Sequence, residues 1–217
     1  MATLTNQHAL QSAARPTAWT AGLRLPGVGF FVLSAGFMTV IMLAASIAPG
    51  YDYNAAAISD LGVITETALL FNITLIVVGL LNLVAGYAFY RHHRRGWLLA
   101  IYALAGLGAV GAGAIPLGTS DLHSLFALAA FVFFNVEAIG TGFVLHGPMK
   151  PISWLAGVAG LAYVVIMIIG DSGNTVVFGA IGHGGSERMI VYPVMLWMLA
   201  MSGYLMAGTP AEDRGRD

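Results

Sequence analysis

The chain has 217 residues, of which 58% are hydrophobic and 9% are charged, and its mean hydropathy is +0.82. Because soluble domains carry about a quarter of their residues as charges, this composition predicts a protein whose solvent is the lipid bilayer. With a net charge of −1, the chain as a whole lacks the basic excess that is typical of nucleic-acid-binding proteins, and the absence of Cys excludes disulfides, zinc–thiolate sites and thiol nucleophiles.

Residues 1–25 are polar and mixed, and they precede the first long apolar run. They contain no short apolar core followed by a small-residue cleavage site. We therefore expect a disordered cytoplasmic tail and not a cleaved signal peptide. Residues 209–217 are again polar, and we expect them to form a cytoplasmic C-terminal tail.

Six apolar runs lie between the tails, and each is about 20 residues or longer, the length that crosses a hydrocarbon core of roughly 30 Å as a helix. The connections between the runs are too short to hold another domain. The sequence therefore predicts an all-α integral membrane bundle of six transmembrane helices, formed by residues 26–208. The runs are residues 26–48, 67–90, 97–117, 122–145, 151–170 and 189–208.

Small residues recur at fixed spacing on the second and third runs. Asn72, Gly79 and Gly86 lie seven residues apart, so they share one helix face, which we expect to look into the bundle. The third run contains GLGAVGAGA at residues 106–114. Small residues at i, i+4 spacing predict a thin helix that packs closely against neighbours on more than one side.

The basic residues predict the orientation of the bundle. If the N-terminus is cytoplasmic, eight of the nine Lys and Arg residues lie in cytoplasmic segments, and Arg188 alone lies outside. Because cytoplasmic loops are enriched in Lys and Arg, we expect both termini inside. The turn RHHRR at residues 91–95 is then a topology anchor that contacts anionic lipids at the headgroups.

The predicted outer loops collect the acidic residues and most of the side chains that chemistry requires. The candidate ligand-binding residues are Asp60, Asn72, Asp121, His123, Glu187 and Arg188. They come from three separate loops and from the start of the second helix. Asp and His side chains gathered at one membrane face have the composition of a metal site or an acid–base site.

A purely structural interpretation of these residues is also open. Ser120 or Asp121 would cap the fourth helix, and Ser186 and Glu187 would begin the sixth. Arg188 would pair with Asp60 or Asp171 and hold a loop against the bundle.

Two chemical interpretations stand beside the structural one. In the first, the outer loops bind a small ligand, an ion or a lipid headgroup. In the second, His123, His183, Asp60 and Asp121 hold a zinc ion, although no helix presents two His residues at i, i+3 or i, i+4. The sequence indicates no other cofactor.

Ser59, Asp60 and His123 are the candidate catalytic residues, because a serine, a carboxylate and a histidine, here His123 or His183, can form a hydrolytic triad. The Gly-x-Ser-x-Gly sequence that places such a serine on a sharp turn is missing. The sequence therefore favours a role other than catalysis.

Glu137 is the one acidic residue inside an apolar run. It lies 14 residues after His123, about 21 Å along a helix, so it cannot share a site with the outer cluster. We predict that Glu137 faces the bundle and bonds to Asn82 or Tyr204, which lie at a similar depth. Its role is either a proton relay or a hydrogen-bonded strut.

Three short motifs resemble a known family. They are AISDLG at residues 57–62 with LFN at residues 70–72, His123 at the start of the fourth helix, and GSER at residues 185–188. Together they resemble the prokaryotic membrane proteins catalogued as domain of unknown function 998, over roughly residues 27–207. The first helix pair is more distantly similar to the DRAM/Sfk-type six-helix membrane proteins. The resemblance implies six helices in a bacterial or archaeal plasma membrane and no particular activity.

The sequence thus predicts a multi-pass membrane protein whose outer polar cluster closes the bundle and binds a small ligand, an ion or a lipid headgroup. Membrane lipids are expected partners, nucleic acid is not, and homo-oligomer formation stays open. One alternative is a membrane-embedded, metal-dependent lipid hydrolase. Another is a proton-coupled carrier that uses Glu137, although no inverted repeat is visible in the six runs.

Overall fold

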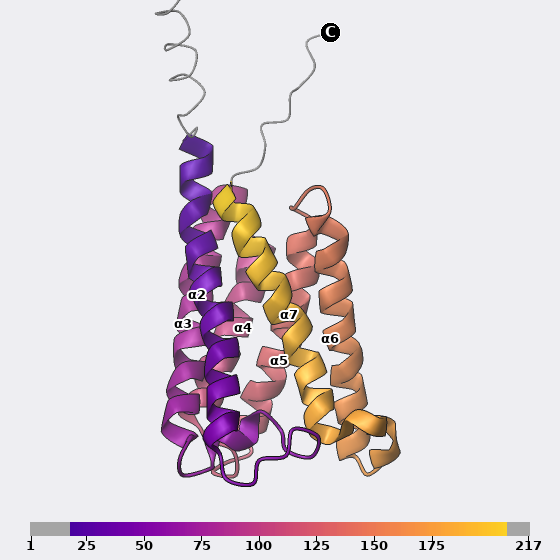
Figure 1. Ribbon diagram of the computed structural model, residues 1–217. Helices are drawn as coiled ribbons and strands as arrows, with labels where there is room; N and C mark the ends of the chain where they lie inside the picture. Colours follow the sequence, from indigo (N-terminus) through magenta and orange to yellow (C-terminus); the bar gives the residue numbers. More distant parts are fainter. Residues whose placement is uncertain (1–17, 208–217) are drawn as a thin grey trace, which may run out of the picture.

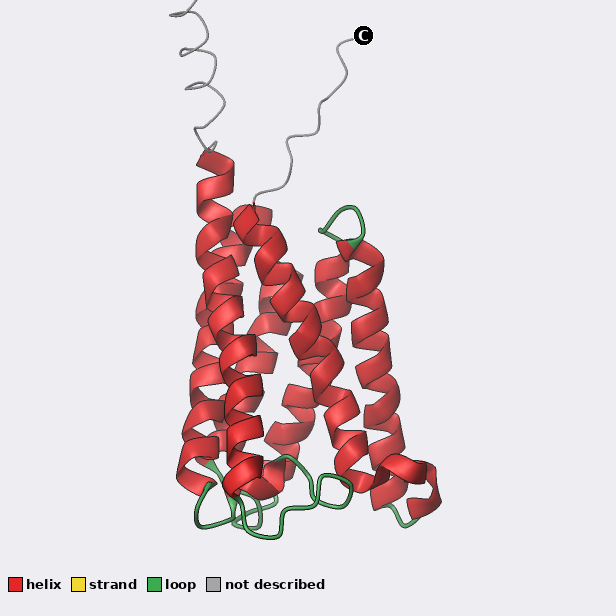
Figure 2. Ribbon diagram, viewed as in Figure 1, coloured by secondary structure: helices red, strands yellow, loops and turns green. Residues whose placement is uncertain are grey.

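The computed structural model describes residues 18–207 as six long helices and two short 3₁₀ helices, with no strand in that range (Figures 1 and 2). The long helices are α2 (Ala18–Ile47), α3 (Ala68–His93), α4 (Gly96–Ala114), α5 (Leu122–Gly142), α6 (Met149–Asp171) and α7 (Gly182–Ala207). The 3₁₀ helices are η1 (Ser59–Gly62) and η2 (Thr175–Ile181).

The six long helices form a closed ring in chain order, because each packs against the next and α7 packs back against α2 (Figure 1). Short connections make consecutive helices antiparallel. The start of α2 and the end of α7 therefore lie at the same end as the α3–α4 and α5–α6 turns, which we name the turn end. The opposite end, with residues 48–67, 115–121 and 172–181, is named the loop end.

The outer surface of the ring is apolar. Leu69, Leu155 and Val84 are 75%, 71% and 65% exposed, which water would penalise and lipid tails accept. All six long helices are long and apolar enough to cross a membrane. The predicted all-α bundle of six membrane-spanning helices is confirmed.

Close helix packing around α4 follows from its small residues. A side chain at Gly79 of α3 would strike the backbone oxygen of Gly106, and one at Gly86 would lie 2.7 Å from Tyr102. On the other side of α4, a Cβ atom at Gly108 would lie 2.6 Å from the backbone nitrogen of Ala130 in α5. The prediction of a thin helix packed on more than one side is confirmed, as is the inward face of α3.

Two helix ends differ from the predicted ones. Helix α2 already includes residues 18–25, which the sequence assigns to the N-terminal tail, while residues 1–17 and the predicted C-terminal tail at 209–217 lie outside the described residues. Helix α7 begins at Gly182 and not at residue 189, so GHGGSER forms its first two turns. Glu187 and Arg188 are therefore helical and buried, not part of an exposed loop.

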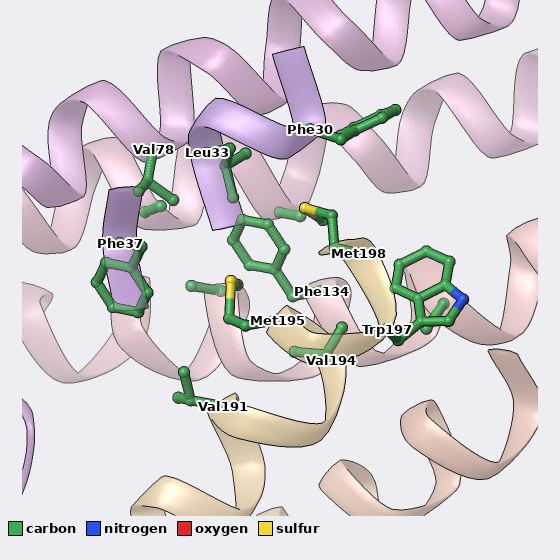
Figure 3. Packing of buried hydrophobic residues seen from close by; sticks show 14 of the residues in the cluster. Phe30, Leu33, Phe37, Val78, Phe134, Val191, Val194, Met195, Trp197 and Met198 are labelled. Carbon is green, nitrogen blue, oxygen red and sulfur yellow. The ribbon is translucent and has the colours of Figure 1, made fainter. Parts of the chain in front are cut away.

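The centre of the ring is filled mainly by α2 and α7 together with α5. Figure 3 shows Phe37, Val191, Val194 and Met195 arranged around Phe134 in this interior. Pro193 lies inside α7 and lacks the N–H that continues the helical bonding pattern. Nearby, the Asn135 side chain donates to the carbonyl of Ile190 (3.1 Å), which connects α5 to the part of α7 just before this proline.

Candidate functional site

Arg188 of α7 anchors the first loop at the loop end. Its Nη1 donates to the carbonyl oxygens of Tyr53 (3.0 Å), Ala56 (3.0 Å) and Gly184 (2.7 Å). Its Nη2 donates to the hydroxyl of Tyr51 at 2.6 Å. Among the described residues, Arg188 makes no salt bridge, so the predicted pairing with Asp60 or Asp171 is wrong. Backbone carbonyls take the place of the carboxylate.

Tyr51 and Tyr53 complete the surroundings of this guanidinium. Arg188 Cζ lies 4.8 Å from the ring centroid of Tyr53 and 5.5 Å from that of Tyr51, within cation–π range. The Tyr51 hydroxyl donates in turn to the Ala57 carbonyl at 2.7 Å. Burial raises the pKa of Tyr51 to about 12, although the adjacent Arg188 opposes the shift. The phenol is therefore protonated at neutral pH, as its donor role requires.

Two carboxylates fix the start of η1. Asp60 Oδ2 accepts from the backbone N–H of Ala57 (2.8 Å), which is a contact within the loop. Glu187 Oε2 accepts from the N–H of Ile58 (2.6 Å), which joins the loop to α7. Glu187 is only 3% exposed, so the Ile58 N–H replaces part of the water that its carboxylate loses on burial.

Glycine and asparagine allow the loop to lie directly on the first turn of α7. A Cβ atom at Gly184 would strike the carbonyl oxygen of Ala56, so only glycine permits this approach. The N–H of Gly184 donates to the Asn54 carbonyl (2.8 Å), and the Asn54 side chain donates to the Ala180 carbonyl (2.7 Å). The loop is thus attached to α7 and to η2.

Asn72 attaches the other end of the same loop to α3. Its Nδ2 donates to the Gly62 carbonyl at 2.8 Å, and the buried hydroxyl of Thr67 donates to the Leu61 carbonyl at 2.7 Å. Asn72 was a candidate ligand-binding residue, and its observed contact holds the polypeptide. The first loop is therefore fixed at both ends and covers the loop end of the ring.

His123 lies beneath this cover, in the first turn of α5, and is 3% exposed. Its Nδ1 lies 2.7 Å from the Ile115 carbonyl oxygen and 3.2 Å from that of Ala112. Carbonyl oxygens only accept hydrogen bonds, so Nδ1 carries a hydrogen. In the neutral ring, Nε2 then has a lone pair, and this buried atom has no hydrogen-bond partner among the described residues.

A cavity of about 50 Å³ brings His123, Ser59 and Glu187 together. Its remaining lining is apolar and includes Phe71 and Ala127. The volume is several times the minimum of roughly 10–15 Å³ that one water molecule needs. Asp60, Asp121 and His183 do not line this cavity, so the cluster predicted from sequence is only partly assembled here.

A second cavity of about 50 Å³ adjoins the first, toward the middle of the ring. The two share six lining residues, which are Phe37, Leu75, Ala109, Ala130, Phe131 and Val191. The second cavity continues among Val78, Phe134 and Met195, whose side chains are seen in Figure 3. Both cavities are lined almost entirely by apolar surface, with Ser59, His123 and Glu187 on the wall nearer the loop end and Asn135 on the wall of the deeper cavity.

His183 and Asp171 form a separate pair farther along the loop end. His183 Nε2 lies 3.2 Å from Asp171 Oδ1, and the two side chains are 37% and 58% exposed. Within residues 18–207, no group of three or more His, Asp or Glu side chains is arranged to hold a metal ion. His123, His183, Asp60 and Asp121, the zinc ligands of one interpretation, are therefore not assembled into such a group.

The predicted helix caps are only partly right. Ser120 Oγ accepts from the N–H of Leu122 (3.2 Å) and so caps α5, whereas Asp121 makes no capping bond and is exposed. Ser186 and Glu187 do not begin α7. Ser186 instead donates to the Gly182 carbonyl (2.8 Å) within the helix.

Glu137 faces the ring interior, as predicted, and its partner is Asn82 of α3. Asn82 Nδ2 donates to Glu137 Oε2 at 2.9 Å and also to the Tyr102 carbonyl at 3.1 Å. Glu137 Oε1 and Asn82 Oδ1 are both buried without a partner among the described residues. A proton on the carboxyl group would join these two oxygens and complete a reciprocal pair of hydrogen bonds.

Sequence reasoning missed the roles of Tyr51, Tyr53 and Asn54. A usable signal existed, because Arg188 is the single predicted outer cation and aromatic rings with free carbonyls in a nearby loop are suitable partners for it. The burial of Glu187 was missed because the glycine-rich residues 182–185 favour a loop, which would place the carboxylate at a solvated helix start.

Searches of curated proteins and of solved structures give no significant match to this chain. The family described as "Protein of unknown function (DUF998)" matches residues 31–204, a range that begins in α2 and ends in α7. The match includes the first loop, His123 and the start of α7. The chain therefore belongs to the DUF998 family.

Proposed function

We propose that this membrane protein binds a small amphipathic molecule, neutral or cationic, in the two adjoining cavities under the first loop. The observation that carries the proposal is the unpartnered Nε2 of buried His123 at a cavity that also has Glu187 on its wall. A buried polar atom without a partner is costly, and a ligand that supplies the hydrogen bond removes the cost.

The chemistry of the polar wall selects the polar group of the ligand. Neutral His123 offers a lone pair on Nε2, and Glu187 offers carboxylate oxygens, so both accept hydrogen bonds. A ligand must therefore donate, as a hydroxyl or an amine does. Six acidic residues lie at the loop end, and the guanidinium of Arg188 is engaged by the loop. This charge distribution disfavours an anionic ligand.

The apolar wall selects the rest of the ligand. Phe131, Leu75 and Val191 line both cavities, and no charged residue lines the deeper one. Apolar cavities of this kind stay dry and take up hydrocarbon. The two volumes of about 50 Å³ are smaller than the roughly 150 Å³ cavity that holds a benzene ring, so a short chain fits better than a full lipid tail.

Calorimetry with three six-carbon probes tests the proposal. 1-Hexanol, hexylamine and hexanoate are titrated into the protein in nanodiscs. We expect the alcohol and the amine to bind and the carboxylate not to bind. His123→Ala should weaken binding about tenfold, since one buried hydrogen bond is lost. Ala127→Phe, which fills the first cavity, should abolish it.

A matched control separates site binding from partition into lipid. His183→Ala removes the other loop-end histidine, which pairs with Asp171 away from the cavity, and should leave the affinity unchanged. Equal binding of hexanoate, or equal affinity in the parent and in His123→Ala, would contradict the proposal.

We further propose that the loop end faces outward across a plasma membrane and that both termini are cytoplasmic. The support is the placement of five described Arg and Lys residues at the turn end and the acidic residues at the loop end. Because the chain has no Cys, single Cys substitutions report the side directly. An impermeant maleimide should label Glu66→Cys in intact cells and His146→Cys only after permeabilisation. The reverse result would overturn the orientation.

A further inference from the structure

The turn end carries a set of positive charges that no acidic side chain of residues 18–207 balances. Among the described residues, its exposed cations are Arg24, Arg91, Arg94, Arg95 and Lys150, and we name this set with His92, His93 and His146 the turn-end surface. Of the seven acidic residues in residues 18–207, six lie at the loop end and Glu137 lies inside the bundle. The balancing negative charge must therefore come from outside this part of the protein.

The α3–α4 and α5–α6 turns place this charge together. His146, in the second of these turns, and Arg95, in the first, both lie close enough to His93 to interact with it electrostatically. The Nε2 atom of His93 is buried and has no hydrogen-bond partner among the described residues. Cations and an unpartnered ring nitrogen thus lie around the junction of the two turns.

The α3–α4 turn is held in a strained form that exposes its arginines. Arg94 has φ 54°, in the left-handed region that non-glycine residues rarely adopt, and its N–H donates to the Tyr90 carbonyl at 2.7 Å. Only residues 94 and 95 separate α3 from α4. An asparagine or glycine would adopt this backbone conformation more easily. We therefore infer that the Arg94 side chain makes an interaction whose free energy offsets the strain.

Aromatic side chains mark the membrane depth of the same surface. Arg91 lies 6.0 Å from the Tyr87 ring centroid, and Lys150 lies 5.2 Å from that of Trp154. Trp97 at the start of α4 is 47% exposed. Trp and Tyr with flanking cations are typical of the headgroup region of a bilayer. The cations are therefore at the level of lipid phosphates and not in bulk water.

We propose that the turn-end surface binds the phosphate groups of anionic phospholipids, centred on the junction between the α3–α4 and α5–α6 turns. Arginine and lysine side chains donate hydrogen bonds to phosphate oxygens. The loop end, with its six carboxylates, would repel the same lipids. The protein would thus collect anionic lipid in one leaflet only.

Native mass spectrometry of the full chain tests this proposal with phosphatidylglycerol and phosphatidylcholine of identical acyl chains. We expect tighter binding of phosphatidylglycerol. Replacing Arg94 by Gly and Arg95 by Gln should reduce that affinity about twenty-five-fold, or roughly fivefold for each cation. Glycine suits the left-handed backbone at position 94, so the turn is kept. Glu66→Gln at the loop end is the charge control and should have no effect.

Two further arms keep the result interpretable. Lys150→Gln lies on the other helix pair and should cost about fivefold without touching the strained turn. Inorganic phosphate should fail to displace the lipid, because it lacks the chains that anchor the headgroup at this depth. Equal affinity for both lipids, unchanged affinity in the Arg94 and Arg95 variant, or displacement by inorganic phosphate would each overturn the proposal.

Discussion

Arg188 shows how one buried side chain organises the loop end. Its guanidinium bonds three carbonyls and a phenol, and it lies against two aromatic rings. A planar fork with five donors can do this, whereas the point charge of a lysine cannot. The covering loop thus depends on the shape of this side chain as well as on its charge.

We therefore expect Arg188→Lys to destabilise the protein by about 2–3 kcal/mol, since most of the bonds to the loop are lost. Thermal unfolding in detergent measures the effect. Asp171→Asn is the control, because Asp171 is 58% exposed and has no contact with Arg188, and it should change stability by less than about 0.5 kcal/mol. Similar losses in both variants would contradict a specific role for the bonds between Arg188 and the loop.

Tyr51 makes the stability of the protein fall at high pH. Burial raises its pKa to about 12, above the value of 10 in an unfolded chain. The neutral phenol is thus favoured by folding, and its stabilising contribution is complete below pH 10 and lost as the pH rises through 12. Unfolding measured at pH 8 and pH 11 should show a smaller loss in Tyr51→Phe than in the parent. An equal loss would exclude Tyr51 as the cause.

Glu137 and Asn82 form a fully buried polar contact inside the bundle. If the carboxyl group carries a proton, a glutamine at position 137 can reproduce the reciprocal pair, because its amide donates to Asn82 Oδ1 and its carbonyl accepts from Asn82 Nδ2. Glu137→Gln should then match the parent in thermal stability. Glu137→Ala should lose about 1–3 kcal/mol, because Asn82 is left without its partner. Equal losses would show that the charge, and not the pair, is required.

Helix α3 illustrates what seven-residue spacing of small residues accomplishes. Gly79 meets the Gly106 backbone, Gly86 meets Tyr102, and a Cβ atom at Gly113 would lie 2.6 Å from the Asn72 carbonyl oxygen. These three contacts run along the whole antiparallel α3–α4 pair. Backbone-to-backbone approach of this kind replaces the hydrophobic effect, which does not drive association between helices in lipid.

Gly79→Ala should therefore destabilise the bundle by about 1–3 kcal/mol, because the new methyl group strikes backbone atoms that cannot rotate away. Gly36→Ala is the matched control. A Cβ atom there has no neighbour within 4 Å, and alanine favours helix by about 1 kcal/mol over glycine. Unfolding should show a loss for the first variant and no loss for the second. Equal behaviour would exclude close packing at Gly79.

Helix existence could be predicted from sequence, whereas the start of α7 could not. Apolar length decides which segments cross a bilayer, and this is a local property of the chain. Residues 182–188 contain three glycines, so local propensity favours a loop. Glycine is needed at position 184 because the covering loop lies directly against the helix there. That contact joins residues far apart in the chain, and no local pattern reports it.

The candidate site was predictable in part for the same reason. His123 and Glu187 stand out as polar residues beside apolar runs, and both do line the cavity. Asp60 stands out equally, but its carboxylate is engaged by Ala57 within the loop. Which polar group faces a cavity and which faces its own backbone depends on how the loop closes over the ring.

At the scale of the whole molecule, the ring has an apolar outer surface and polar residues at both of its ends. The loop end closes over a cavity that His123 lines, and the turn end carries exposed cations that no acidic side chain within residues 18–207 balances. The central claim is that a small hydrogen-bond donor with an apolar body occupies those cavities. The claim predicts a particular location inside the ring, and not merely an affinity.

Photo-crosslinking with a short aliphatic alcohol that carries a diazirine tests that location most directly. After irradiation of the protein in nanodiscs, mass spectrometry should find the probe on residues that line both cavities, such as Phe131, Leu75 and Val191. His123→Ala should remove this labelling. Labelling confined to lipid-facing residues such as Leu69 and Leu155, with no difference in His123→Ala, would contradict the account.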